Sequence, residues 1–156
     1  MHITIVAVGQ KLPAWAQTAV DDYLARFPRD FTVIVKEVKA EARTGGKPVA
    51  QVMAAEAERI ERAVPAGDIL VAMDEHGRDM TTLDFSKKIS GWKNEGCGVT
   101  FIIGGADGLD PALKAKSRMM LRLSSMTLPH AFARVLLTEQ IYRAWSILAN
   151  HPYHRV

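Results

Sequence analysis

Hydrophobic positions along this chain fall into two alternating patterns. Short, nearly continuous apolar runs rich in β-branched residues predict buried strands, and they cover residues 2–8, 31–38, 68–73, 99–103 and 119–123. Stretches with helical periodicity or helix-start signals predict helices, and they cover about 13–26, 49–63, 82–94, 111–116 and 130–149. The regular alternation of strands and helices predicts an α/β fold, with a mostly parallel sheet covered by helices on both faces.

Local patterns refine the helices and loops. Trp15 belongs to the apolar stripe of the first helix, which predicts that it faces the core, and Thr82 is a suitable N-cap for the third long helix. Residues 40–48, together with Lys39, combine cations with a Gly-Gly pair and predict a mobile basic loop. Residues 74–78 predict a polar loop at the carboxyl end of the third strand.

The predicted C-terminal helix carries two different stripes. One stripe is apolar and is predicted to face the core; it consists of Leu137, Ile141, Trp145 and Leu148. The other stripe is polar and is predicted to form a solvated back, the side of the helix that faces water; it consists of Glu139, Arg143, Ser146 and Asn150. Phe132, Val135 and Leu136 widen the apolar arc beyond one core contact, which indicates a second buried surface such as a homodimer interface.

Composition limits the class of protein. The chain has 156 residues, of which 48% are hydrophobic and 24% are charged, and this predicts one globular domain spanning 1–156. The single cysteine, Cys97, excludes a disulfide framework and a thiolate metal cluster and favours a reducing compartment. The chain begins without a signal-peptide pattern and contains no apolar run long enough for a membrane span, so we expect a cytoplasmic protein with no membrane partner.

Positive charge is concentrated at one end of the chain. The net charge is +3, and residues 117–156 contain five arginines, no lysine and one acidic residue, Glu139. A guanidinium suits phosphate oxygens and stacks on bases, so this segment indicates contact with RNA. Arginines that only decorate a helix surface would give the same pattern.

Two loops that follow predicted strands are candidates for a ligand cleft, because ligands of open α/β sheets bind at the carboxyl ends of strands. Residues 104–109 contain three glycines, which permit close backbone approach, and residues 123–129 alternate small hydroxylated with apolar side chains. Neither a G-x-G-x-x-G fingerprint nor a phosphate loop is present, so the pattern favours a ligand without phosphates, such as S-adenosylmethionine. A tight turn and an ordinary loop remain the alternatives for these two segments.

The tail, residues 151–155, places an aromatic ring, two imidazoles and a guanidinium within five positions. These are the side chains that proteins use to contact phosphate and stack on bases of unpaired RNA. A frayed terminus is the alternative. The His-x-x-His spacing has no cysteine or carboxylate partner nearby, so we expect no metal site.

Several segments together resemble one family. They are ITIVAVG at 3–9, IIGG at 102–105, LPH at 128–130, YRAWSI at 142–147 and NHPYHR at 150–155. They resemble the RlmH family of large-subunit ribosomal RNA pseudouridine N3-methyltransferases, which belongs to the SPOUT superfamily. The likeness runs along nearly the whole chain with similar spacing, and the C-terminal block is its most specific part.

The resemblance implies a SPOUT-type α/β fold with a C-terminal trefoil knot, a homodimer, and S-adenosylmethionine bound by the knot loops. Carried over position by position, the implied cofactor contacts are Met73, Gly104, Gly105, Leu123, Ser124, Ser125, Met126, Thr127 and Leu128. Family members usually have Leu at position 73, which conserves volume. They often have Pro-Glu where this chain has Ala106-Asp107, a difference that affects the rigidity of the glycine loop.

The resemblance also implies the reaction, which is methylation of N3 of pseudouridine 1915 in 23S ribosomal RNA within assembled ribosomes. Only the deprotonated ring attacks a sulfonium methyl readily, so we expect His154 or Arg155 to favour the developing anion and Tyr153 to stack on the base. A non-enzymatic ribosome- or RNA-binding module, with the cleft a structural remnant, is the alternative function. A nucleotide-dependent transferase or hydrolase is disfavoured by the missing phosphate loop.

Overall fold

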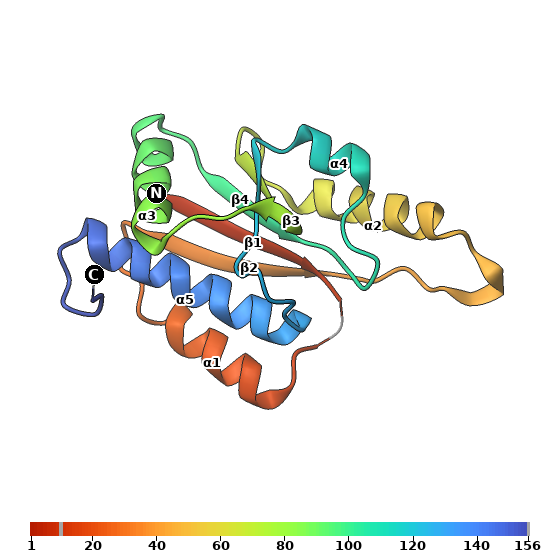
Figure 1. The fold of residues 1–156 in the computed structure, drawn as a ribbon, viewed down its shortest axis with the longest axis horizontal. Coiled ribbons are helices and arrows are strands. Elements are labelled where there is room, and N and C mark those ends of the chain that lie inside the picture. The colour runs from red at the N-terminus through yellow and green to blue at the C-terminus, as the bar shows by residue number, and fades with distance from the viewer. Residues whose placement is uncertain (10, 156) are drawn as a thin grey trace.

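A five-stranded sheet forms the centre of the computed structural model, which describes residues 1–9 and 11–155 (Figure 1). Its strands are β1 (His2–Val8), β2 (Thr32–Val38), β3 (Ile69–Arg78), β4 (Val99–Ile103) and β5 (Met119–Leu121). They lie in the order β2-β1-β4-β3-β5, and every pairing is parallel. The predicted α/β class with a mostly parallel sheet is therefore confirmed.

Helices cover both faces of this sheet, as the alternating pattern predicts. They are α1 (Ala14–Leu24), α2 (Val49–Ala63), α3 (Thr82–Asn94), α4 (Pro111–Lys116) and α5 (His130–Leu148), with a 3-10 turn η1 (Thr44–Gly46) before α2. One core joins α3 and α5 to the sheet, and α1 packs on α5 beside it. A second core joins α2 and α4 to the opposite face. The two groups of helices are visible on either side of the strands in Figure 1.

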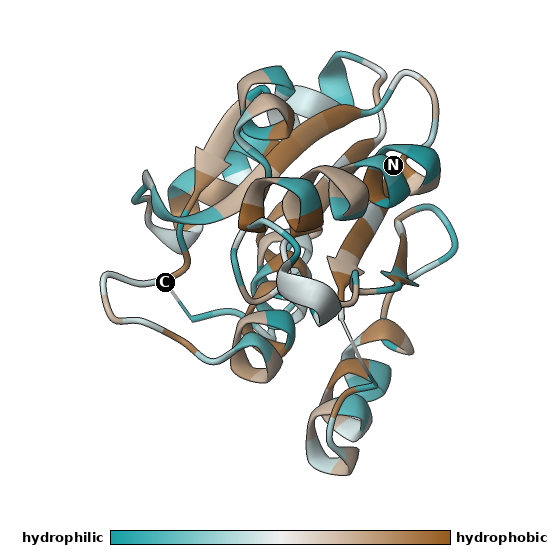
Figure 2. Cartoon of the chain, turned by 90° about the vertical axis from the view of Figure 1, so that its right-hand side faces the viewer, coloured by the Kyte–Doolittle hydropathy of each residue, from teal (hydrophilic) through white to brown (hydrophobic). Residues whose placement is uncertain are grey.

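Hydropathy follows these layers. Seen from the side in Figure 2, the strands in the middle are brown, whereas the helices around them alternate brown and teal. Strand β4 is buried at every residue, and β1 is buried at every residue after His2. Among the described residues, no helix combines the length and apolarity that crossing a bilayer requires.

Strand β3 is longer than the sequence pattern predicts. It continues through 74–78, where we expected a polar loop, because Met73 and Arg78 both pair with Leu121 of β5 across a bulge. The Arg122 N–H donates to the Arg78 carbonyl at 3.1 Å and closes this irregular ladder. A bulge sets the direction of a strand end without any signal in hydrophobic periodicity, which explains the difference.

Two predictions about single side chains in the helices are wrong. Trp15 is 50% exposed rather than in the core, because α1 turns Ala16 and Val20 inward and leaves Trp15 against Phe132 at a ring distance of 4.8 Å. The N-cap of α3 is Thr81, whose hydroxyl accepts the Asp84 N–H at 3.1 Å. The Thr82 hydroxyl instead donates to Gln140 Oε1 at 2.7 Å and links α3 to α5.

The polar stripe of α5 is also not a solvated back. Ser146 is fully buried, and the Glu139 side chain is only 12% exposed. The chain after α5 folds back and covers this stripe, so its polar groups pair with the tail rather than with water. The opposite stripe behaves as predicted at Leu137 and Ile141, which are fully buried.

The bulge provides a test of the fold. A Cβ on Gly77 would lie 2.7 Å from the Leu121 carbonyl carbon, so Gly77→Ala must push β3 and β5 apart. We expect it to lower the free energy of unfolding by about 1–3 kcal/mol, which is typical of overpacking. Gly91→Ala is the matched control, because Gly91 lies in α3 with open space around it, and it should stabilise by roughly 0.5–1 kcal/mol. Urea denaturation measures both, and equal stability of the two variants would contradict the bulge geometry.

Candidate functional site

Two adjoining cavities lie where β4 and β5 end, beside the middle of β3. The smaller, about 150 Å³, lies against the chain that leaves β5, and the larger, about 590 Å³, lies over the glycine loop 104–108. Both are lined by Met73 and Glu75 from β3, by Ile103 from β4, and by Leu128 and Ala133 at the start of α5. They therefore form one continuous depression, which we call the strand-end cleft.

The residues predicted to hold a cofactor gather around this cleft. Those that line it are Met73, Gly104, Gly105, Leu123, Ser124, Met126, Thr127 and Leu128. Ser125 is exposed and lies outside the lining of both cavities. The Ser124 hydroxyl accepts the Met126 N–H at 2.9 Å, which turns the loop at this point and leaves the Met126 side chain 77% exposed.

The glycine loop is held by contacts between its own backbone atoms. The Gly108 N–H donates to the Gly105 carbonyl at 3.0 Å, and Gly108 has a φ of +83° that favours glycine. A Cβ on Gly104 would lie 2.6 Å from the Gly108 carbonyl carbon, so no other residue fits at position 104 without moving the loop. Gly104 therefore presents bare backbone to the cleft.

A buried carboxylate supports the loop from below. Glu56 of α2 is 4% exposed, and a Cβ on Gly105 would lie 3.0 Å from its Oε1. Its Oε2 accepts the Glu41 N–H at 3.0 Å. On the outer side of the loop, Arg43 pairs with Asp107 at 2.5 Å. The segment before α2 is thus tied to the glycine loop by the Arg43–Asp107 ion pair, while Glu56 lies close beside Gly105.

Asp74 and Lys114 form an ion pair at the mouth of the cleft, with 3.0 Å between Nζ and Oδ2. Burial acts to raise the pKa of Asp74, but the His76 N–H and the Lys114 ammonium outweigh it and lower that pKa. The carboxylate is therefore ionised at neutral pH and holds β3 to α4. Within residues 1–9 and 11–155, no three His, Cys, Asp or Glu side chains are arranged to hold a metal ion.

Sequence reasoning missed His130 and Arg134, which lie one turn apart on α5. His130 lines the cleft, and its Nε2 accepts a hydrogen bond from Arg134 Nε at 3.2 Å. Arg134 is 1% exposed, although the sequence pattern counted it among surface cations, and it pairs with Glu37 of β2 at 3.3 Å. The available signal was the i,i+4 spacing of a histidine and an arginine directly behind Pro129.

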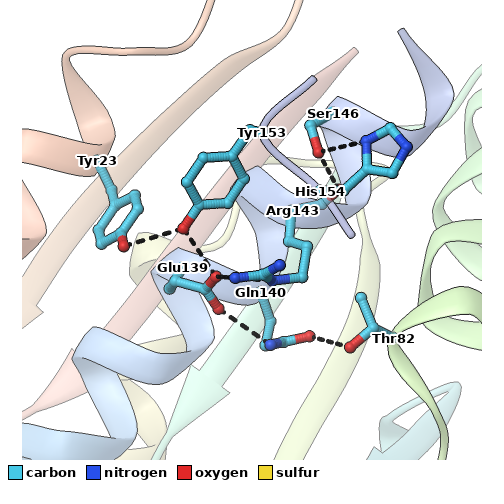
Figure 3. Close-up of polar contacts among 8 residues, drawn as sticks. All are labelled: Tyr23, Thr82, Glu139, Gln140, Arg143, Ser146, Tyr153 and His154. Atoms are coloured by element: carbon cyan, nitrogen blue, oxygen red, sulfur yellow. Dashed lines mark hydrogen bonds and ion pairs between the residues drawn. The ribbon is translucent and has the colours of Figure 1, made fainter. Parts of the chain in front are cut away.

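The tail packs on the far half of α5 (Figure 3). Tyr153 donates from its hydroxyl to Glu139 Oε1 at 3.0 Å and lies 3.1 Å from the Tyr23 hydroxyl. Its ring meets Tyr142 edge to face at 4.7 Å, with the Arg143 guanidinium 4.9 Å from its centre. Burial, followed by the hydrogen bonds to Tyr23 and Glu139, raises the pKa of Tyr153. Tyr153 is thus an anchor of the tail in this conformation.

His154 continues this anchoring, whereas Arg155 is exposed. The Ser146 hydroxyl donates to the Arg143 carbonyl at 2.7 Å and lies 3.1 Å from His154 Nδ1. Because the single proton of that hydroxyl is donated to Arg143, Ser146 accepts a hydrogen bond from the Nδ1–H of His154.

The structure does not bring the tail to the cleft of its own chain. Ser146, which holds His154, lies sixteen residues after His130, so α5 separates the two by about 24 Å along its axis. The cleft is lined by residues at the start of α5, such as His130 and Ala133. The tail lies at the other end of this helix (Figure 1).

A family model described as "Predicted SPOUT methyltransferase" matches residues 1–154. The chain belongs to the SPOUT methyltransferases. This SPOUT methyltransferase is 53% identical to a protein of Ralstonia pickettii over the full length of both chains, and 54% identical to one of Bordetella avium over 99% of each. Both relatives are named ribosomal RNA large subunit methyltransferase H, in agreement with the resemblance in the sequence.

Solved structures with little sequence identity share the fold of this chain. A probable methylase of Haemophilus influenzae has a TM-score of 0.59 at 13% identity, covering 99% of this chain and 70% of its own. A putative RNA methyltransferase of Bacillus anthracis has a TM-score of 0.52 at 13% identity, covering 99% and 98%. The trefoil knot stays a prediction.

The anchored tail of this SPOUT methyltransferase predicts a pH dependence of stability. The pKa of Tyr153 is raised in the folded state, whereas an unfolded tyrosine ionises near pH 10, so the stabilising contribution is complete below about pH 10 and declines above it. Between about pH 9 and 11, the free energy of unfolding should fall more steeply for wild type than for Tyr153→Phe. The difference is at most about 1.4 kcal/mol per pH unit, the limit for one proton. Urea titrations at each pH measure the free energy of unfolding of both proteins. If the two free energies fell in parallel with pH, the hydroxyl of Tyr153 would not be buried against α5.

Proposed function

We propose that this chain transfers a methyl group from S-adenosylmethionine to N3 of a pseudouridine in large-subunit ribosomal RNA, with pseudouridine 1915 of the assembled ribosome as the target. One observation carries the proposal. The chain is 53% identical over its full length to a relative named for ribosomal RNA methylation, and eight of the nine cofactor positions implied by that family line a single cleft.

The residues around the strand-end cleft fit this methyl donor. Gly104 offers bare backbone for hydrogen bonds, since a Cβ has no room there. Leu123, Met126 and Leu128 supply apolar surface for the two faces of an adenine ring. The cofactor supplies a sulfonium-bound methyl group, and we infer that Met73, Gly104, Gly105 and residues 123–128 hold it.

The tail provides the chemistry that the acceptor base needs. N3 must lose its proton before it attacks a methyl group, and a neutral imidazole whose Nδ1–H donates to Ser146 would offer the lone pair of its Nε2. We assign proton acceptance to His154 and stabilisation of the developing anion to Arg155. Stacking of Tyr153 on the base requires its ring to leave the contacts with Tyr142 and Arg143.

A homodimer reconciles the position of the tail with this role. Since the tail lies about 24 Å along α5 from its own cleft, we infer that a second copy supplies it. An apolar patch suits such a contact: Trp15, Phe132 and Leu136 are 50%, 48% and 37% exposed. A groove of about 180 Å³ continues the patch beside Leu136 and is lined by Phe85, Leu121 and Leu123.

Methyl transfer to ribosomes tests the function. Ribosomes from cells that lack this protein are incubated with it and methyl-labelled S-adenosylmethionine, and the ribosomal RNA is digested and analysed by mass spectrometry. We expect one N3-methylated pseudouridine, at position 1915. Gly104→Ala should abolish labelling, whereas Gly91→Ala, far from the cleft, should not. Binding to ribosomes without label would favour the non-enzymatic module.

The oligomeric state is a separate test. Leu136→Glu places a charge in the apolar patch and should convert a dimer into a monomer in analytical ultracentrifugation, with methyl transfer lost. Val49→Glu is the matched control, because Val49 is 54% exposed at the start of α2, on the other side of the sheet. A wild-type chain that sediments as a monomer would contradict the shared site.

A further inference from the structure

Glu75 is a carboxylate in the wall of the strand-end cleft that the proposed reaction does not use. It lines both cavities, and residues common to the two cavities lie where these meet. The common residues are Met73, Asp74, Glu75, Ile103, Leu128 and Ala133. Only Asp74 and Glu75 among them are acidic or basic, so the charge at this junction comes from two carboxylates.

The other carboxylates of the cleft wall are neutralised by ion pairs. Asp74 Oδ2 lies 3.0 Å from Lys114 Nζ, and Asp107 Oδ2 lies 2.5 Å from the Arg43 guanidinium. Glu75 has no lysine or arginine partner in the part of the chain that the structure describes. It therefore leaves one uncompensated negative charge at the junction of the two cavities.

The remaining charged and titratable groups of the lining do not cancel the charge of Glu75. Arg122 donates to both carboxylate oxygens of Asp79, each at 2.6 Å. His76 Nε2 lies 3.4 Å from Glu75 Oε1, but a histidine is charged only when protonated, and both side chains are exposed. Burial lowers the pKa of His130. At about pH 8, where an ordinary histidine is neutral, the Glu75 carboxylate is available to a cationic ligand.

The methyl donor and its product differ by one positive charge, located on sulfur. Methyl transfer breaks the bond between sulfur and the methyl carbon, the carbon bonds to N3, and sulfur keeps the electron pair of the broken bond. The product, S-adenosylhomocysteine, retains the adenine, the ribose and the amino acid but has lost the sulfonium charge. Contacts with backbone or apolar side chains therefore bind both molecules alike, whereas a carboxylate near sulfur attracts only the donor's sulfonium.

We propose that Glu75 is a specificity-determining residue of the cleft: its carboxylate attracts the sulfonium and so favours S-adenosylmethionine over S-adenosylhomocysteine. Its position supports this role. Adenine packed against Leu123 and Leu128 in the smaller cavity, with the rest of the donor along Gly104 in the larger one, leaves the sulfur near the junction, beside Glu75. This inference rests on the proposed binding of S-adenosylmethionine in the cleft.

Calorimetry with both molecules at about pH 8 and low salt tests the preference. Glu75→Gln keeps the shape and removes the charge, so it should weaken binding of S-adenosylmethionine about two- to fivefold, as expected for an exposed ion pair, and leave S-adenosylhomocysteine unchanged. Glu75→Asp keeps the charge and should retain most of the preference. Glu58→Gln is the matched control, because it removes the same charge from an exposed site on α2, where Glu58 pairs with Arg62. Equal losses for both molecules, or no loss for either, would overturn the proposal.

Salt provides a second readout, which a merely structural role of Glu75 would not move. Raising the ionic strength from about 0.01 M to 1 M shortens the Debye length from about 30 Å to 3 Å. The preference of wild type for the donor should then decrease toward that of Glu75→Gln, and a preference unaffected by salt would overturn the proposal. If wild type bound neither molecule, the proposed function would fail as well. If it bound and methylated normally but Glu75→Gln behaved as wild type, only this inference would fail.

Discussion

Direct packing of backbone on backbone is the constraint on which the cleft depends. At position 104 the chain leaves β4 so close to Gly108 that a methyl group does not fit, and at position 77 β3 lies equally close to Leu121 of β5. These two contacts bring the ends of β4 and β5 and the middle of β3 to one cleft. The cleft is consequently walled by peptide groups of the glycine loop as well as by apolar side chains such as Leu123 and Leu128, which suits a ligand recognised partly through hydrogen bonds to backbone.

Hydrophobic periodicity predicted the strands and helices, because the burial of each element is encoded in the spacing of its own apolar residues. Strands β1 and β4 are buried on both faces and read as continuous apolar runs, and their predicted bounds agree with the structure. The bulge in β3 left no such trace, because it is caused by the partner strand and by the missing side chain of Gly77. The exposure of Trp15 likewise depends on how α1 packs against α5. The hydrophobic pattern of one helix does not contain this information.

The candidate site was predictable in part for the same reason. Residues 104–105 and 123–128 follow strands, so topology alone places them at one edge of the sheet. Their roles come from the resemblance. His130 and Arg134 were not recognised, because the importance of Arg134 depends on its burial, and that depends on Glu37 reaching it from a strand almost a hundred residues earlier in the chain. The polar stripe of α5 was misread because the covering segment is the chain's own tail.

Helix α5 joins the strand-end cleft and the tail at a fixed spacing. His130, in the first turn of α5, lines the cleft, and Glu139 and Ser146 bind the tail farther along the helix. Inserting or deleting one residue between them would rotate the tail-binding face by about 100° and break its alignment with the start of the helix. Natural variation in length should therefore accumulate in surface segments such as the one around η1, while the stretch from the cleft to the tail keeps a constant number of residues.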